Sequence, residues 1–311
     1  MTTQLSWTAS PSAACWQAAE HWAAGRVPAA ATMHEALAGG FAAPAEALGV
    51  FLRDQNIPTT PFFEHLTPAA CEIESNRALA HTALTKTVGR GRADLLAERT
   101  AGLLTDCETA YFAAFPRLRE ELELRYRPLR ELWDARGPGL VAGIGRRTDR
   151  ALVPEAARVA AVPPYLGGGG WPAAPSNTVV FEMVLANPIN QLPETVRLGW
   201  LVTLLNYDLP DFAEALPSER ARDIAAWAML PAALEAAADL ELVWPDAAGQ
   251  LLATAAAAWL PTTLRRPASD GDSATATLVG GWWQAASRDK AAWGVKLRAL
   301  GRLLTEAAEE H

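Results

Sequence analysis

One segment restricts the fold more than any other: the stretch from Pro193 to about Tyr207, which is apolar on nearly every side when drawn as a helix. Its apolar side chains surround the helix axis, and they are Val196, Leu198, Trp200, Leu201, Val202, Leu204 and Leu205. A helix without a polar face has no side to present to water, so other elements must enclose it. We therefore expect a fold built around one buried helix.

Two short, valine-rich runs precede this helix, at Arg158–Pro163 and Thr178–Leu185. Their β-branched side chains and short length predict strands. The residues between them, Tyr165 to Asn177, are rich in Gly and Pro and predict a loop. Two strands joined in this way indicate an antiparallel hairpin, or part of a small antiparallel sheet.

Helical periodicity dominates both sides of this centre. Residues 1–136 predict helices separated by Pro and Gly, and the strongest of them, Pro116–Arg136, is expected to end at Gly137-Pro138-Gly139. From Phe212 onward the pattern is helical again. We therefore predict a predominantly helical α+β protein, with N- and C-terminal helical halves around the small antiparallel hairpin or sheet and the buried helix. The halves are 1–136 and 151–311, which can also form one continuous domain.

The charge balance argues against nucleic acid as a partner, because a net charge of −8 repels a polyanion. The most Arg-rich stretch, Arg117–Arg150, carries nine Arg against six acidic residues, interleaved as on a solvated helix face. The apolar runs are too short to span a bilayer. A secretory signal begins with basic residues, whereas the first basic residue here is Arg26. We expect neither a nucleic-acid nor a membrane partner.

Cysteine usage indicates the compartment. Cys15, Cys71 and Cys107 are far apart and form no C-x-x-C pair, which is typical of buried, reduced thiols in a cytoplasmic protein. The chain is alanine-rich, and Arg outnumbers Lys by 24 to 3. This coding bias suggests a GC-rich genome, and hence a bacterial source.

Catalytic and metal-binding signatures are missing from the sequence, which has no G-x-S-x-G, G-x-x-x-x-G-K-[ST] or H-E-x-x-H motif. On the helix expected around residues 67–88, Glu74 and His81 share a face. Seven residues separate them, about 10.5 Å along a helix axis, which is too far for one ion. We therefore predict no cofactor and no metal.

Glu182 is the most unusual polar residue, because it lies in a strand whose other side chains are apolar. Such a carboxylate must be exposed at a sheet edge, paired or functional. The following helix offers Arg197 as the partner of a structural ion pair, and Asn206 as a further polar group. The sequence leaves three alternatives: edge exposure, a Glu182–Arg197 pair, or a carboxylate that faces a ligand.

Four consecutive glycines, Gly167 to Gly170, precede Trp171 in the predicted loop. Such a run costs backbone entropy unless the chain bends sharply or approaches another group closely. It predicts either a disordered hairpin tip or a flap that places Trp171 over a cleft, and both would exchange amide hydrogens quickly. The candidate binding residues are Glu182, Arg197, Asn206, Trp171, Gly169 and Gly170.

The order of a strand, a short loop and a buried helix resembles the core of zincin-type metallopeptidases, whose helix carries H-E-x-x-H. The resemblance covers about 50 residues and concerns layout alone. Here the helix reads Arg-Leu-Gly-Trp-Leu-Val-Thr-Leu-Leu-Asn from Arg197 to Asn206 and contains no His, so no catalytic residue carries over. The resemblance implies a metal-free relative of that core.

Three functional hypotheses follow. The first is a non-catalytic intracellular binding or interaction module for a small molecule or a protein, with its site near Glu182, Trp171 and the buried helix. The second is a hydrolase-like enzyme that uses Glu182 as an acid or base, which requires a carboxyl group in a cleft with a raised pKa. The third is an oligomerisation surface, which requires an exposed apolar patch around Trp282 and Trp283.

Overall fold

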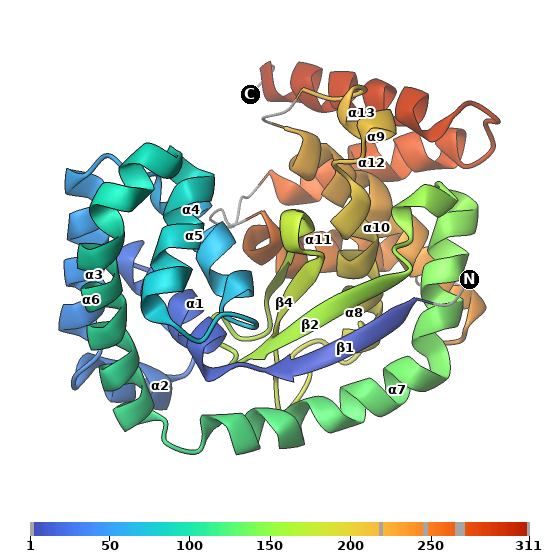
Figure 1. Cartoon of the computed structure of the whole chain (residues 1–311). Coiled ribbons are helices and arrows are strands. Elements are labelled where there is room, and N and C mark those ends of the chain that lie inside the picture. Colours follow the sequence, from blue (N-terminus) through green and yellow to red (C-terminus); the bar gives the residue numbers. More distant parts are fainter. Residues whose placement is uncertain (1–2, 218–219, 245–247, 265–270, 310–311) are drawn as a thin grey trace.

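The computed structural model describes residues 3–217, 220–244, 248–264 and 271–309. In these residues thirteen α-helices and three short 3-10 helices surround one four-stranded sheet (Figure 1). The predicted fold class, a predominantly helical α+β protein with a small central sheet, is confirmed.

The sheet has the order β1-β2-β4-β3. Its strands are β1 (Gln4–Ala9), β2 (Ala156–Val162), β3 (Gly170–Ala173) and β4 (Thr178–Glu182). β2 pairs in parallel with both β1 and β4, whereas β3 is antiparallel to β4. The predicted antiparallel pairing of the two valine-rich runs is therefore wrong. The reason lies in the supposed loop between them: it forms β3, which turns directly into β4 and takes the antiparallel position.

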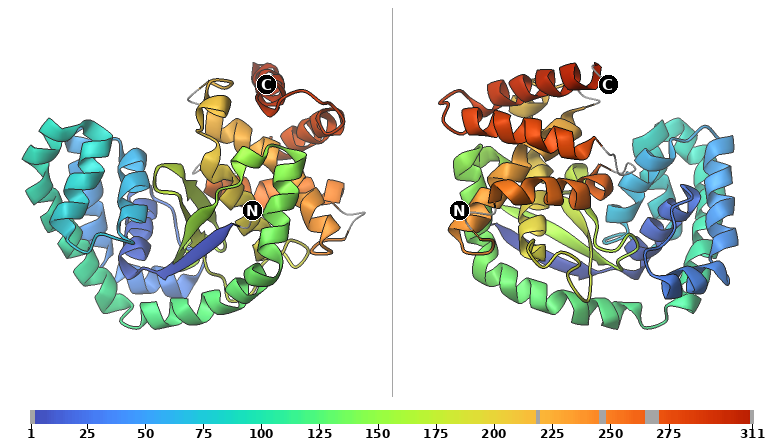
Figure 2. Two further views of the ribbon diagram at one scale, coloured as in Figure 1. Left: turned by 45° about the vertical axis from the view of Figure 1, so that its right-hand side comes forward. Right: turned by 180° about the vertical axis from the view of Figure 1, so that it is seen from behind.

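A group of helices lies to one side of the sheet (Figures 1 and 2). They are α1 (Pro11–Ala23), α2 (Ala31–Ala38), α3 (Ala42–Asp54), α4 (Thr59–Ala69), α5 (Asn76–Val88) and α6 (Arg90–Ala114). β1 precedes this group in the chain and pairs with β2, which follows it. The division into 1–136 and 151–311 stays a prediction, and strand pairing joins the two parts.

A long curved helix, α7 (Leu118–Arg147), runs beneath the sheet from this group to the other side of the molecule (Figure 1). It continues through the Gly-Pro-Gly sequence at 137–139, where we predicted its end. Its interior prolines remove backbone N–H donors, which is a common cause of helix bending. Burial maintains the helix beyond that point: the Trp133 ring packs closely over Gly137, and Ile144 is buried further on.

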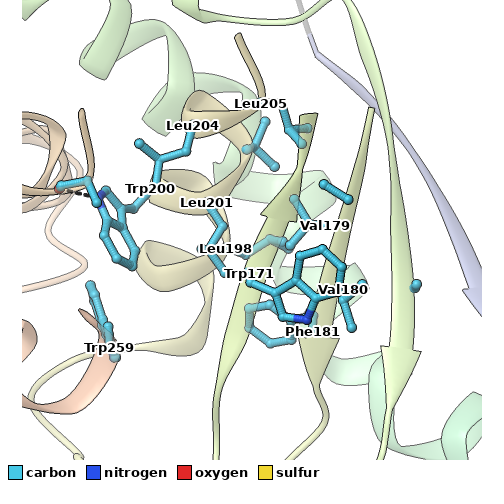
Figure 3. Close-up of a cluster of buried hydrophobic side chains, with 14 of the residues drawn as sticks. Trp171, Val179, Val180, Phe181, Leu198, Trp200, Leu201, Leu204, Leu205 and Trp259 are labelled. Carbon is cyan, nitrogen blue, oxygen red and sulfur yellow. Dashed lines mark hydrogen bonds between the residues drawn. The ribbon is translucent and has the colours of Figure 1, made fainter. Parts of the chain in front are cut away.

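The buried helix is confirmed as α8 (Glu194–Thr203), followed by the 3-10 helix η3 (Leu204–Asn206). Every residue from Thr195 to Leu205 is buried. Figure 3 shows Leu201 directed toward the sheet and Trp200 directed away from it, toward Trp259. The Trp200 indole also donates a hydrogen bond to the carbonyl of Ala226, 3.1 Å away. α8 is therefore enclosed by the sheet and by C-terminal helices.

The C-terminal helices are α9 (Pro210–Ala213), α10 (Ala221–Asp239), α11 (Ala248–Thr263), α12 (Asp272–Ala286) and α13 (Trp293–Glu309). The exposed apolar patch that the oligomerisation hypothesis requires around Trp282 and Trp283 is not formed, because these side chains are only 7% and 4% exposed. Helix α13 packs against them: the centroid of the Trp293 ring lies 6.1 Å from that of Trp282 and 6.3 Å from that of Trp283. The three indoles form one buried cluster.

Among the residues that the structure describes, no single helix is both long and apolar enough to cross a bilayer. Only α2 and α3 taken together, with a bend of 76° between them, reach the required length and composition.

Candidate functional site

The parallel strands β1, β2 and β4 end at the same edge of the sheet. Glu182 is the last residue of β4, and the loop that follows β2 reaches this edge with its glycines. Helix α1, which follows β1, packs here as well, and its Gln17 contacts Glu182. Ligands of open α/β sheets bind outside the carboxyl ends of parallel strands, so this edge is the first place to look for a site.

The Glu182 carboxylate is 1% exposed and is surrounded by protein donors. Oε1 accepts hydrogen bonds from Gln17 Nε2 at 2.8 Å and from the N–H of Leu166 at 2.9 Å. Oε2 accepts from the N–H groups of Gly168 and Gly169, at 2.9 and 2.8 Å. Burial raises the pKa of Glu182, and the backbone hydrogen bonds and the charge of Arg197 partly oppose this rise.

Of the three alternatives for Glu182, edge exposure is wrong, because β4 lies between β2 and β3. A direct ion pair with Arg197 is also not formed. The Arg197 guanidinium pairs instead with Glu194, one helical turn before it. Glu182 and Arg197 nevertheless belong to one buried cluster. They contact, from opposite sides, the loop of residues 163–169 between β2 and β3, here called the glycine loop.

Arg197 is 1% exposed and binds backbone carbonyls. Its Nη1 donates to the carbonyl oxygens of Gly168 and of Gly169, the latter at 2.8 Å, and Nη2 donates to that of Glu182 at 3.2 Å. The guanidinium also lies over the Phe181 ring, 4.1 Å from its centroid. Glu182 accepts hydrogen bonds from the N–H groups of this loop, and Arg197 donates hydrogen bonds to its carbonyl oxygens. Two oppositely charged side chains therefore fix the loop.

The four glycines have a structural explanation in this arrangement. Gly167 and Gly168 have φ of +88° and +125°, a conformation that side chains with a Cβ rarely adopt. The turn brings three N–H groups toward one carboxylate, which no extended loop could do. The prediction of a disordered hairpin tip does not agree with this packing.

Trp171 and Gly170 belong to strand β3. Trp171 pairs with Val180 of β4 and is 4% exposed, so its ring is part of the core (Figure 3). It therefore covers no cleft, contrary to the flap hypothesis. Gly170 lies where an added Cβ would come within 2.9 Å of Leu201, so close packing against α8 requires Gly there.

Asn206 lies away from the cluster. It follows Arg197 by nine residues, about 13 Å along a helix axis. Its Nδ2 donates to the carbonyl of Ala151 at 2.8 Å, and so ties η3 to the segment before β2. Of the predicted site residues, the structure brings together Glu182, Arg197 and Gly169, with Gly170 next in the chain.

Two polar residues of this region escaped the sequence analysis: Gln17 and His21 on α1, both at most 5% exposed. Their spacing of four residues, in a helix whose other residues are mostly apolar, is the signal that could have revealed a shared face. The His21 ring lies 4.9 Å from that of Tyr165, measured between centroids. Burial, with a smaller contribution from the charge of Arg26, lowers the pKa of His21 to about 3.

The lowered pKa of His21 predicts acid sensitivity. Between about pH 6.5 and pH 3 the unfolded chain binds a proton at His21 that the native state does not, so stability falls as the pH falls. The His21→Phe variant keeps a ring against Tyr165 and removes this titration. From pH 8 to pH 5 it should lose about 2 kcal/mol less stability than the wild type. Urea unfolding at both pH values measures this, and parallel losses would contradict it.

A surface depression of about 540 Å³ lies beside the glycine loop. Eight of its eleven lining residues are apolar, and the full lining is Ala29, Ala30, Thr32, Met33, Phe115, Arg125, Pro164, Gly167, Val184, Leu185 and Ala186. Gly167 links it to the loop that Glu182 and Arg197 hold. None of the predicted site residues lines it, although Gly167 and Val184 lie only two residues from Gly169 and Glu182 in the chain.

A further depression, of about 390 Å³, lies between α10, α11 and α12. Its carboxylate, Glu235, is already bound by the Trp283 indole at 2.7 Å and by Arg147 at 3.3 Å. The depression beside the glycine loop is the better candidate for a site, because most of its lining is apolar and its one charged residue, Arg125, makes only a long 3.7 Å contact with Glu121.

In the structure, the layout that resembles the zincin core consists of β4, the loop of residues 183–193 and α8. Helix α8 contains no His, and its first turn carries Arg197. Within the described ranges, no group of three or more His, Cys, Asp or Glu side chains is placed to hold a metal ion. The relationship stays a hypothesis.

No family model matches the chain, and neither a curated protein nor a solved structure matches it.

Proposed function

We propose that this chain is a non-catalytic binding protein that holds a small apolar molecule in the depression beside the glycine loop. The observation that carries the proposal is the apolar lining of this depression, with Leu185 82% exposed at its wall. Most small-molecule sites are apolar hollows of about 300–1,000 Å³ with a few polar groups. From the cysteine usage and coding bias we assign the protein to the bacterial cytoplasm.

The glycine loop supports this function by forming a fixed wall. Glu182 and Arg197 hold its backbone from both sides, so little ordering remains to be done when a ligand arrives. The same bonds argue for binding over hydrolase-like catalysis. Both oxygens of Glu182 already accept hydrogen bonds inside the protein, and its side chain would have to leave them before it could act as an acid or base.

The proposal can be tested with Nile red, an uncharged dye that fluoresces in apolar surroundings. Leu185→Asp should weaken dye binding by about tenfold or more, since a carboxylate would then line the apolar hollow. Leu95→Asp is the matched control: Leu95 is also 82% exposed, but it lies on α6 outside the depression. Equal dye binding by the two variants, or no binding by the wild type, would contradict the proposal.

A further inference from the structure

Arg125 is the only ionisable residue among the eleven that line the depression. It lies on α7, and its side chain is 22% exposed. The neighbouring residue, Tyr126, stacks on Trp7 of β1 with 5.6 Å between ring centroids. This contact fixes α7 against the sheet, and so places Arg125 at the wall of the depression.

The guanidinium of Arg125 is only loosely paired. Its Nη2 lies 3.7 Å from Oε2 of Glu121, whose side chain is 54% exposed. A surface pair of this kind contributes little to stability. In the described part of the chain, no atom accepts a hydrogen bond from this guanidinium. Its N–H donors are therefore available to a ligand, beside apolar walls that strengthen an electrostatic contact.

We propose that the ligand is an amphipathic anion. Its carboxylate or sulfonate group binds the Arg125 guanidinium, whose paired N–H groups match two oxygens. Its apolar part covers Met33, Phe115 and Leu185, which also line the depression. This inference rests on the proposed function, and it adds the chemical class of the ligand.

The test compares three ten-carbon probes that differ in their polar group: decanoate, decanol and decyltrimethylammonium. Each is titrated against protein-bound Nile red. Wild-type protein should bind decanoate about tenfold more tightly than decanol, since the carboxylate forms charge-assisted hydrogen bonds with the Arg125 guanidinium and the decanol hydroxyl group carries no charge. The cationic probe should bind most weakly. Arg125→Gln should abolish the preference for decanoate and leave decanol binding unchanged.

Arg127→Gln is the matched control, because Arg127 is exposed on the same helix, lies outside the depression and carries the same charge. It should retain the preference, and Arg125→Lys should retain part of it. Equal binding of decanoate and decanol to the wild type, or a loss of preference in both Gln variants, would overturn the inference. Nile red binding that still depends on Leu185 would then leave the proposed function standing. Failure of the wild type to bind the dye would overturn both.

Discussion

Replacing Glu182 with Ala is expected to lower the free energy of unfolding by about 3–5 kcal/mol. The carboxylate accepts hydrogen bonds from Gln17 and from the backbone of Leu166, Gly168 and Gly169. Removing it leaves these donors without an acceptor in a buried position, and each such donor costs about 1–3 kcal/mol unless the loop rearranges. Urea unfolding at pH 7 measures the change.

Two further measurements make this prediction specific. Glu123→Ala, which removes the same charge from an exposed position on α7, should leave the unfolding midpoint unchanged. Hydrogen exchange should show slow amides at Gly168 and Gly169 in the wild type and fast ones in Glu182→Ala. An unchanged midpoint in Glu182→Ala, or fast exchange of these glycines in the wild type, would show that the carboxylate does not hold the loop.

Replacing Arg197 with Met should have an effect of similar size, about 3–5 kcal/mol, because it breaks a buried ion pair on one side only. The Glu194 carboxylate, whose side chain is 18% exposed, would lose its cation. The carbonyls of Gly168 and Gly169 would lose their donor as well. Lys is not expected to restore stability, since a single ammonium group cannot reach the same acceptors.

A double-mutant cycle separates these two costs. In the Arg197→Met background, Glu194→Gln removes the stranded charge and should recover about 1–2 kcal/mol. In the wild-type background the same change should be destabilising, because there it breaks the pair. If Glu194→Gln has the same effect in both backgrounds, the two side chains are not coupled and the ion pair contributes nothing to stability.

The features that could be predicted from the sequence depend on local patterns. The apolar surface of the stretch around Trp200 implies burial in any fold, and α8 is buried throughout. The alternation along β4 is also local: Phe181 faces α8 through Arg197, whereas Glu182 faces α1 through Gln17. The same reasoning singled out Glu182 as a carboxylate that must be exposed, paired or functional, since an apolar strand offers it no partner.

Long-range pairing could not be predicted in this way. Gln17 and Glu182 are 165 residues apart, and no periodicity connects them. Most of the acceptors and donors that satisfy Glu182 and Arg197 are backbone groups, which carry no sequence signature. The sequence therefore indicated a direct Glu182–Arg197 pair as one alternative, because Arg197 is the nearest side chain of opposite charge in the sequence. In the structure both side chains bind the backbone of the glycine loop between them.

The sequence by itself determined the helical α+β class and the buried helix, because hydrophobic periodicity reports which side of an element avoids water. It also marked Glu182 as an unusual carboxylate in an apolar strand, but it left open whether that carboxylate is exposed or buried. Only the tertiary structure decided that β2 and β4 run parallel, that β3 lies within the supposed loop, and that the glycines form a packed turn. It alone placed Arg125 beside Leu185 in one depression. The physical reason is that strand direction and surface shape depend on contacts between distant segments, whose energies no local pattern records.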